Sequence, residues 1–160
     1  MAIAPNTTFV IGAVFTANQA SAFPFGNVAL ASSATSYTMT TAAVQTTGMT
    51  VSWTAIANRN YKVTYYEPQV TTPSTLSGYT TVRLYENSVA TGPQLQQGFV
   101  QNSAAVALSG SLTLVYVGTF TAGTRTVIGA GLASSVTGTP IAGRSALSKA
   151  FLLVEDLGPA

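Results

Sequence analysis

The stretch Met49-Thr50-Val51-Ser52-Trp53-Thr54-Ala55 carries an apolar side chain at every odd position and a polar one at every even position. Successive side chains of a β-strand point to opposite faces, so this alternation predicts a strand with one face on a core and one face in water. The pattern recurs at residues 60–65, 81–84 and 111–116. Thr, Val, Tyr and Phe, which dominate these segments, fit a pleated surface. The chain is therefore predicted to be all-β.

Clusters of Gly, Pro, Asn and Ser separate the alternating segments at intervals of about 10–15 residues, which is typical of an antiparallel sandwich. No long segment has the 3.6-residue period of a helix. The sequence predicts an antiparallel jelly-roll-like β-sandwich of 8–10 strands with a short N-terminal arm. The strands are expected at 26–32, 37–46, 48–56, 60–68, 79–87, 94–106, 111–120, 124–132 and 146–155, with 8–15 as either a further strand or an arm.

The first 25 residues differ in composition from the rest. They carry no charge, and Pro5 and the run Phe23-Pro24-Phe25-Gly26 bracket them. We expect residues 1–25 to form an N-terminal arm or anchor, and residues 26–160 to form the sandwich body. Aromatic rings in an arm expose apolar surface unless a neighbouring protein covers them. The four rings of the arm, Phe9, Phe15, Phe23 and Phe25, are accordingly predicted to anchor the arm to a neighbouring protein.

The composition of the chain excludes several kinds of catalytic and metal-binding site. Only 10 of the 160 residues are charged, a quarter are Thr or Ser, and His and Cys are both absent. Without these two residue types the chain has no thiol nucleophile, no Ser-His-Asp triad and no His-ligated zinc or haem. No cofactor and no metal site are predicted. A charge content this low favours a surface that is buried by self-association.

The acidic residues are the remaining candidates for catalysis. A glycan-active enzyme needs two carboxylates about 5–10 Å apart across a cleft. Glu155 and Asp156 are neighbours, so on a strand they point to opposite faces. Glu67 and Glu86 would meet if their strands pair, but both are expected to be rim residues near loops. The prediction is that the protein is not an enzyme.

The basic residues never stand side by side, which argues against nucleic-acid binding. No stretch approaches the ~20 apolar residues of a membrane span, so membrane insertion is not predicted.

The last strand is unlike the others. Ala150-Phe151-Leu152-Leu153-Val154 is apolar at successive positions, so it is apolar on both faces. Such a strand is either central in the sandwich or has one face covered by another subunit. On the second interpretation, the subunit interface contains Phe151, Leu152, Leu153 and Val154.

The aromatic residues differ in whether their position in the alternation faces the core. Trp53, Tyr61 and Tyr65 share the core-facing phase. Three other tyrosines are less tied to that phase and are predicted to be exposed binding aromatics, since exposed Tyr stacks on sugars and anchors protein contacts. These three are Tyr66, Tyr79 and Tyr85.

Several motifs resemble the C-terminal module of tailed-bacteriophage minor tail and tail-fibre proteins. The run 48–65 contains Ala57-Asn58-Arg59-Asn60-Tyr61, which resembles the family's turn between two strands, and 82–87 is similar to the strand that follows. The ending Phe151-Leu152-Leu153-Val154-Glu155-Asp156-Leu157-Gly158-Pro159 resembles the family's terminus. The segment 15–28 is similar to the leader, with Phe15 in place of its Leu. More distantly, the layout resembles the trimeric jelly rolls of the complement-C1q and tumour-necrosis-factor type.

The resemblance implies a non-enzymatic virion structural protein. It would be a homotrimer at the tail or fibre tip, with other phage virion proteins and a host surface glycan or protein as partners. A second virion hypothesis is a trimeric capsid decoration protein anchored by its arm. A hypothesis of another class, a glycan-active enzyme using Glu67 or Glu86, is disfavoured.

Overall fold

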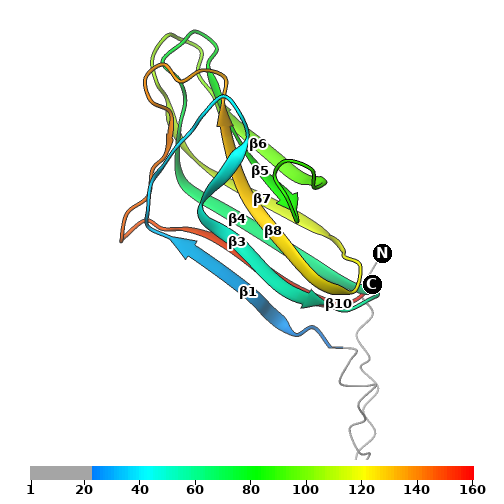
Figure 1. Cartoon of the computed structure of the whole chain (residues 1–160). Helices are drawn as coiled ribbons and strands as arrows, with labels where there is room; N and C mark the ends of the chain where they lie inside the picture. Colours follow the sequence, from blue (N-terminus) through cyan, green and yellow to red (C-terminus); the bar gives the residue numbers. More distant parts are fainter. Residues whose placement is uncertain (1–22) are drawn as a thin grey trace, which may run out of the picture.

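The computed structural model describes residues 23–160, which form two antiparallel β-sheets and contain no helix (Figure 1). In this part of the chain there is accordingly no helix long and apolar enough to span a membrane. The predicted all-β sandwich is confirmed. The strands are β1 (Gly26–Ser33), β2 (Tyr37–Thr38), β3 (Val44–Ala55), β4 (Arg59–Thr71), β5 (Tyr79–Glu86), β6 (Gln94–Gln101), β7 (Ser109–Thr119), β8 (Gly123–Ala133), β9 (Ile141–Ala142) and β10 (Ala150–Pro159).

The topology is that of a jelly roll. The first sheet, called sheet A here, has the order β1-β10-β4-β9-β2, with β7 paired to β4. The second, sheet B, has the order β3-β8-β5-β6. The chain crosses between the sheets from β2 to β3, from β3 to β4, from β4 to β5, from β6 to β7, from β7 to β8 and from β8 to β9. Among the strands of residues 23–160, only β5 and β6 follow each other in the chain and also pair with each other.

The core lies between the two sheets, and the alternation in the sequence correctly predicts which side chains fill it. Trp53, Tyr61 and Tyr65 are each less than a tenth exposed. The Trp53 ring stands edge-on to Phe120, with 5.0 Å between the ring centroids. The Tyr61 hydroxyl accepts a 2.9 Å hydrogen bond from the Ile56 backbone N–H. The Tyr61 side chain thereby gives the core apolar area, and its hydroxyl anchors the residue that follows β3.

The predicted division between the second and third strands is wrong. Residues 37–46 and 48–56 were expected as two strands, but β3 runs continuously from Val44 to Ala55. Gly48 has a φ of 73°, in the left-handed region that glycine enters without strain. It lies where the register of β3 against β8 shifts, between Gln45 and Thr50. The glycine therefore marks a bulge inside one strand.

The last strand is also longer than expected at its end. The predicted boundary was residue 155, whereas β10 pairs with β4 as far as Pro159. The cause is Asp156, which points into the sandwich and is 1% exposed. Its carboxylate accepts two 2.7 Å hydrogen bonds from the Arg59 guanidinium. This buried pair fixes the start of β4 to the end of β10.

Candidate subunit interface

The apolar side chains of β10 divide between two faces. Leu152 and Val154 are fully buried in the core of the same chain. Phe151 and Leu153 alternate with them, half-buried on the outer face of sheet A. Of the four residues assigned to a subunit interface from the sequence, only Phe151 and Leu153 are therefore on a surface that a second chain can reach.

A row of apolar side chains crosses the outer face of sheet A. Leu30 on β1 is directly opposite Leu153, and Leu153 is opposite Thr64 on β4. Thr64 is opposite Val115 on β7. Partners directly opposite each other in antiparallel strands point to the same face. Leu30 is 66% exposed and Val115 44%, so the row presents apolar surface to solvent in the single chain.

Further apolar side chains flank the row. Tyr66 and Phe151 lie side by side with 5.4 Å between their ring centroids. Val117 on β7 is 56% exposed. Lys62 and Glu155 form a 2.8 Å ion pair on the same face, so their charges cancel locally. We call this surface the sheet A face and define it by Leu30, Lys62, Thr64, Tyr66, Val115, Val117, Phe151, Leu153 and Glu155.

The Thr64 hydroxyl, near the middle of the sheet A face, is an orphaned polar group. Its oxygen is buried and has no hydrogen-bond partner among the described residues. Buried polar atoms without partners are uncommon in native structures.

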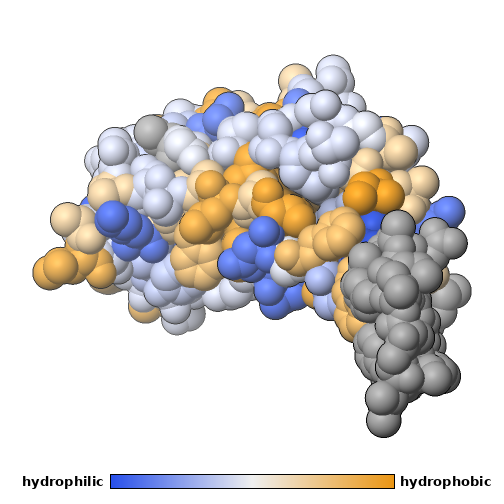
Figure 2. Space-filling model, turned by 90° about the horizontal axis from the view of Figure 1, so that it is seen from below, coloured by the Kyte–Doolittle hydropathy of each residue, from blue (hydrophilic) through white to orange (hydrophobic). Residues whose placement is uncertain are grey.

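Figure 2 views the molecule from the side on which β1 lies in Figure 1, and shows apolar side chains gathered between hydrophilic ones in the middle of that surface.

Reasoning from sequence missed Leu30, Val115 and Val117. A signal for two of them was present: Ser111, Thr113, Val115 and Val117 share the outward phase of β7, and the last two are apolar where water-facing residues are expected. Apolar residues at the outward-facing positions of a strand indicate that the outer face of the sheet is covered.

The arm residues fall into two groups. Phe9 and Phe15 lie outside the described residues. The Phe23 backbone carbonyl accepts a hydrogen bond from the Arg59 guanidinium. The same guanidinium lies 4.1 Å from the centroid of the Phe25 ring, which is 53% exposed. The hydrogen bond to Asp156 raises the pKa of Arg59. Arg59 therefore ties the segment that precedes β1 to the end of β10.

The three predicted binding aromatics do not lie together. Tyr66 is on the sheet A face, and Tyr79, 41% exposed, starts β5 in sheet B. The prediction that Tyr85 is exposed is wrong, because Tyr85 is only 8% exposed. It pairs with Ile128 of β8, and its hydroxyl accepts a 3.2 Å hydrogen bond from Arg83. Tyr85 is covered because β5 pairs with β8. The sequence of β5 alone does not reveal this pairing.

The carboxylates serve as structural ion-pair partners. Glu67, expected at a rim, is fully buried and forms a two-pronged ion pair with Arg144. Burial lowers the pKa of Arg144, but hydrogen bonding and attraction to Glu67 outweigh this and raise it overall. Glu86 pairs instead with Arg125 at 3.3 Å. Glu67 and Glu86 belong to different sheets. Within residues 23–160, no group of three or more acidic side chains is placed to hold a metal ion.

Tyr65 extends the buried network. Its hydroxyl donates a 2.5 Å hydrogen bond to Glu67, and the Thr46 hydroxyl lies 2.7 Å from the same phenolic oxygen. Burial, and then the nearby Glu67 charge, raise the pKa of Tyr65 well above its ordinary value. The network holds this proton and the charges of Glu67 and Arg144 inside the sandwich.

No protein-family model and no curated protein sequence matches the chain. Solved structures with this architecture do match. Murine APRIL aligns with a TM-score of 0.51 at 10% identity, over 82% of this chain and 99% of that chain. Eiger TNF from S. frugiperda aligns with a TM-score of 0.48 at 12% identity, over 84% and 95%. A chain of the Bacillus endospore appendages, described as disulfide-linked pili, aligns with a TM-score of 0.39 at 13% identity, over 82% and 89%.

At these identities the likeness shows the fold alone. The chain has a tumour-necrosis-factor-like jelly roll, as the more distant of the two sequence resemblances implied. The resemblance to phage tail modules has no counterpart among these matches.

Proposed function

We propose that the protein is a non-enzymatic structural protein that assembles into a homotrimer through the sheet A face. The observation that carries this proposal is the row from Leu30 through Leu153 to Val115 across the outside of sheet A. The outer face of a sheet in a monomer is normally polar. Here two of those side chains are between two-fifths and two-thirds exposed in the single chain.

A second copy of the chain is the occupant that fits this face. The face carries no net charge, because Lys62 and Glu155 neutralise each other. Two such faces can approach without like-charge repulsion, and burying the apolar row removes it from water. The whole chain has only 10 charged residues to keep single copies apart in solution.

The number of subunits comes from the resemblance to trimeric jelly rolls. In a three-fold ring each subunit uses two different patches, one on each neighbour. The sheet A face provides such a pair: its broad surface over β10 and β4, and its free edge at β7, where Val115 and Val117 are exposed.

A sharp test introduces a charge into the row. Leu153→Glu places an unpaired carboxylate among apolar side chains, which is tolerated in water but strongly unfavourable in a closed interface. We expect this variant to lose the trimer, while Leu76→Glu, at an exposed loop position outside the face, keeps it. Light scattering of both variants decides the matter. A Leu153→Glu chain that remains a trimer rules out this face.

The virion is the proposed location. The sequence resemblance to minor tail and tail-fibre modules supports a place at the tail or fibre tip, with contact to the host surface. A capsid decoration protein anchored by residues 1–25 is the second candidate. Immunogold labelling of phage particles separates them, because label at the tail supports the first and label over the head the second. Particles that carry no label on either part argue against both.

The arm hypothesis has its own test. Deletion of residues 2–22 retains Phe23 and Phe25, and with them the contacts to Arg59. We expect the shortened chain to remain folded and trimeric and to fail to join particles. If the shortened body unfolds, the arm is part of the core and the domain division at residue 25 is wrong.

An enzymatic function is disfavoured by the use of the carboxylates. Glu67 is enclosed with Arg144 and Glu86 is paired with Arg125, so neither is free to act as an acid or base. Cleavage of polysaccharide by the wild type, lost in the double variant Glu67→Gln and Glu86→Gln with the fold intact, would restore the enzyme hypothesis.

A further inference from the structure

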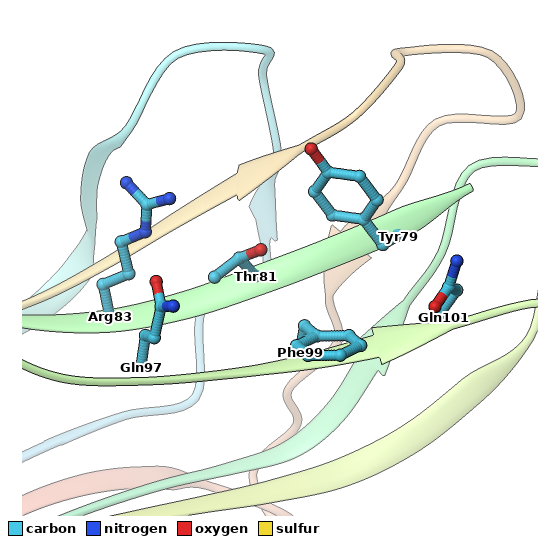
Figure 3. A pocket seen from close by; sticks show the side chains of 6 residues that line it. All are labelled: Tyr79, Thr81, Arg83, Gln97, Phe99 and Gln101. Atoms are coloured by element: carbon cyan, nitrogen blue, oxygen red, sulfur yellow. The ribbon is translucent and has the colours of Figure 1, made fainter. Parts of the chain in front are cut away.

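The outer face of sheet B, on the opposite side of the sandwich from the sheet A face, carries an open depression of about 370 Å³. Six side chains from two paired strands line it, and Figure 3 shows them projecting on one side of the sheet. The register explains why they meet, because every second residue of β5 is directly opposite every second residue of β6. The opposed pairs are Tyr79 with Gln101, Thr81 with Phe99 and Arg83 with Gln97.

Arg83 is the charged group of this depression. All four carboxylates of the sequence pair with other cations, so Arg83 has no acidic partner among the described residues. Its Nε is buried with no hydrogen-bond acceptor, and one terminal nitrogen donates a 3.2 Å hydrogen bond to the Tyr85 hydroxyl. A buried guanidinium N–H normally has an acceptor. The planar fork of Arg matches the two oxygens of a carboxylate.

Aromatic rings and amides complete the lining. Phe99 is 60% exposed and Tyr79 is 41% exposed. An exposed aromatic ring offers a flat apolar surface on which a ligand can pack. The polar groups of the ligand can remain in contact with water. Gln97 and Gln101 stand on either side of Phe99 along the same face of β6 (Figure 3). Each amide has both donors and an acceptor, as sugar hydroxyls require. A few polar groups around an apolar floor are typical of a small-molecule site.

We propose that this depression binds a carboxylate-bearing sugar residue of an acidic glycan. The carboxylate pairs with the Arg83 guanidinium, the face of the sugar ring packs on Phe99, and the hydroxyls bond to Gln97 and Gln101. The inference goes beyond the proposed function, because it uses sheet B and requires neither the trimer nor the virion location.

The test uses matched acidic and neutral sugars with the full chain. Calorimetric titration with sialyllactose and with a galacturonate tetrasaccharide is compared with titration of the carboxyl-reduced form of each sugar. We expect at least one acidic sugar to bind about tenfold or more tightly than its neutral match, since a charged hydrogen-bonded pair is lost in the latter. Inorganic phosphate at the same concentration should not displace it. Equal binding of both acidic sugars and their neutral matches, no binding of either acidic sugar, or displacement by phosphate each overturns the proposal.

Variants locate the binding. Arg83→Gln and Phe99→Ala should each weaken the acidic sugar about tenfold or more, and Phe99→Tyr should retain it. Lys149→Gln removes one positive charge outside the depression and should leave affinity unchanged. If Arg83→Gln does not fold, Phe99→Ala decides, because its side chain is largely exposed. Unchanged affinity in Phe99→Ala overturns the site.

The oligomeric state of each sample is measured in parallel. Trimers that bind no sugar contradict this inference alone, and single chains that bind the acidic sugar contradict the proposed function alone. Loss of the trimer in Phe99→Ala places Phe99 in the subunit contact and likewise overturns the sugar site.

Discussion

Arg144 and Glu67 are 77 positions apart in the chain and form a two-pronged ion pair from which solvent is excluded. Glu67 belongs to β4, in the middle of sheet A, and Arg144 to the connection between β9 and β10. The guanidinium also donates a 3.2 Å hydrogen bond to the Thr35 carbonyl, between β1 and β2. One strand and two connections of the fold therefore converge on the Arg144 guanidinium.

Removing one partner of this pair should be costly. Glu67→Gln leaves the Arg144 charge buried without its counter-charge, and breaking a buried pair in this way costs about 3–5 kcal/mol. The matched control is Glu86→Gln at the partly exposed Arg125 pair, where we expect about 1 kcal/mol or less. Urea unfolding of both variants measures the difference. Equal losses would contradict a structural role for the buried pair.

Tyr65 predicts how stability depends on alkaline pH. Because its pKa is raised in the folded chain, the unfolded chain releases the phenolic proton first as pH rises. The unfolded state then binds fewer protons than the native state, so the free energy of unfolding falls with increasing pH. The contribution is complete below the ordinary tyrosine pKa of about 10 and is lost as pH rises toward the folded pKa.

The measurement is the free energy of unfolding across the alkaline range for the wild type and Tyr65→Phe. We expect a shallower decline in the variant, because this titrating group is absent. Tyr37, whose pKa burial also raises, contributes to both chains and does not affect the difference. Parallel declines in the two proteins would show that Tyr65 is not responsible.

A glycine in sheet B tests the packing of the core. A Cβ at Gly129 of β8 would lie 2.6 Å from the Tyr65 ring, which the buried network holds in place. We expect Gly129→Ala to destabilise the fold by about 1–3 kcal/mol, as overpacked cores do. At Gly110 of β7 the new Cβ would lie 3.8 Å from Val100, an ordinary contact, so Gly110→Ala is the control and should be close to neutral. Thermal unfolding compares the two, and an unaffected Gly129→Ala would show that the ring moves freely.

Period-two alternation was sufficient to predict the core positions of Trp53, Tyr61 and Tyr65, because side-chain direction in a strand follows directly from position. It was not sufficient for β10. Residues 150–154 are apolar at every position and therefore show no alternation. The sequence consequently did not distinguish the buried Leu152 from the outward Leu153. Gly48 was ambiguous for a similar reason, since a glycine with positive φ serves a turn and a bulge equally well.

The features that the sequence did not predict depend on which strands pair with each other. The burial of Tyr85 follows from its β8 neighbour, and the two sides of the sheet B depression meet only through the register of β5 against β6. The Glu67–Arg144 pair joins segments remote in sequence, for which no local pattern exists. The two-residue β9 is too short to show an alternation.

The central claim is self-association through the sheet A face, and the molar mass of the wild-type chain in solution tests it most directly. Sedimentation equilibrium at micromolar concentration should give three times the chain mass of 16.4 kDa, unchanged on dilution within that range. The apolar row from Leu30 to Val115 would then be covered. A mass equal to one chain would contradict the claim, because the row would stand exposed to water in the functional protein.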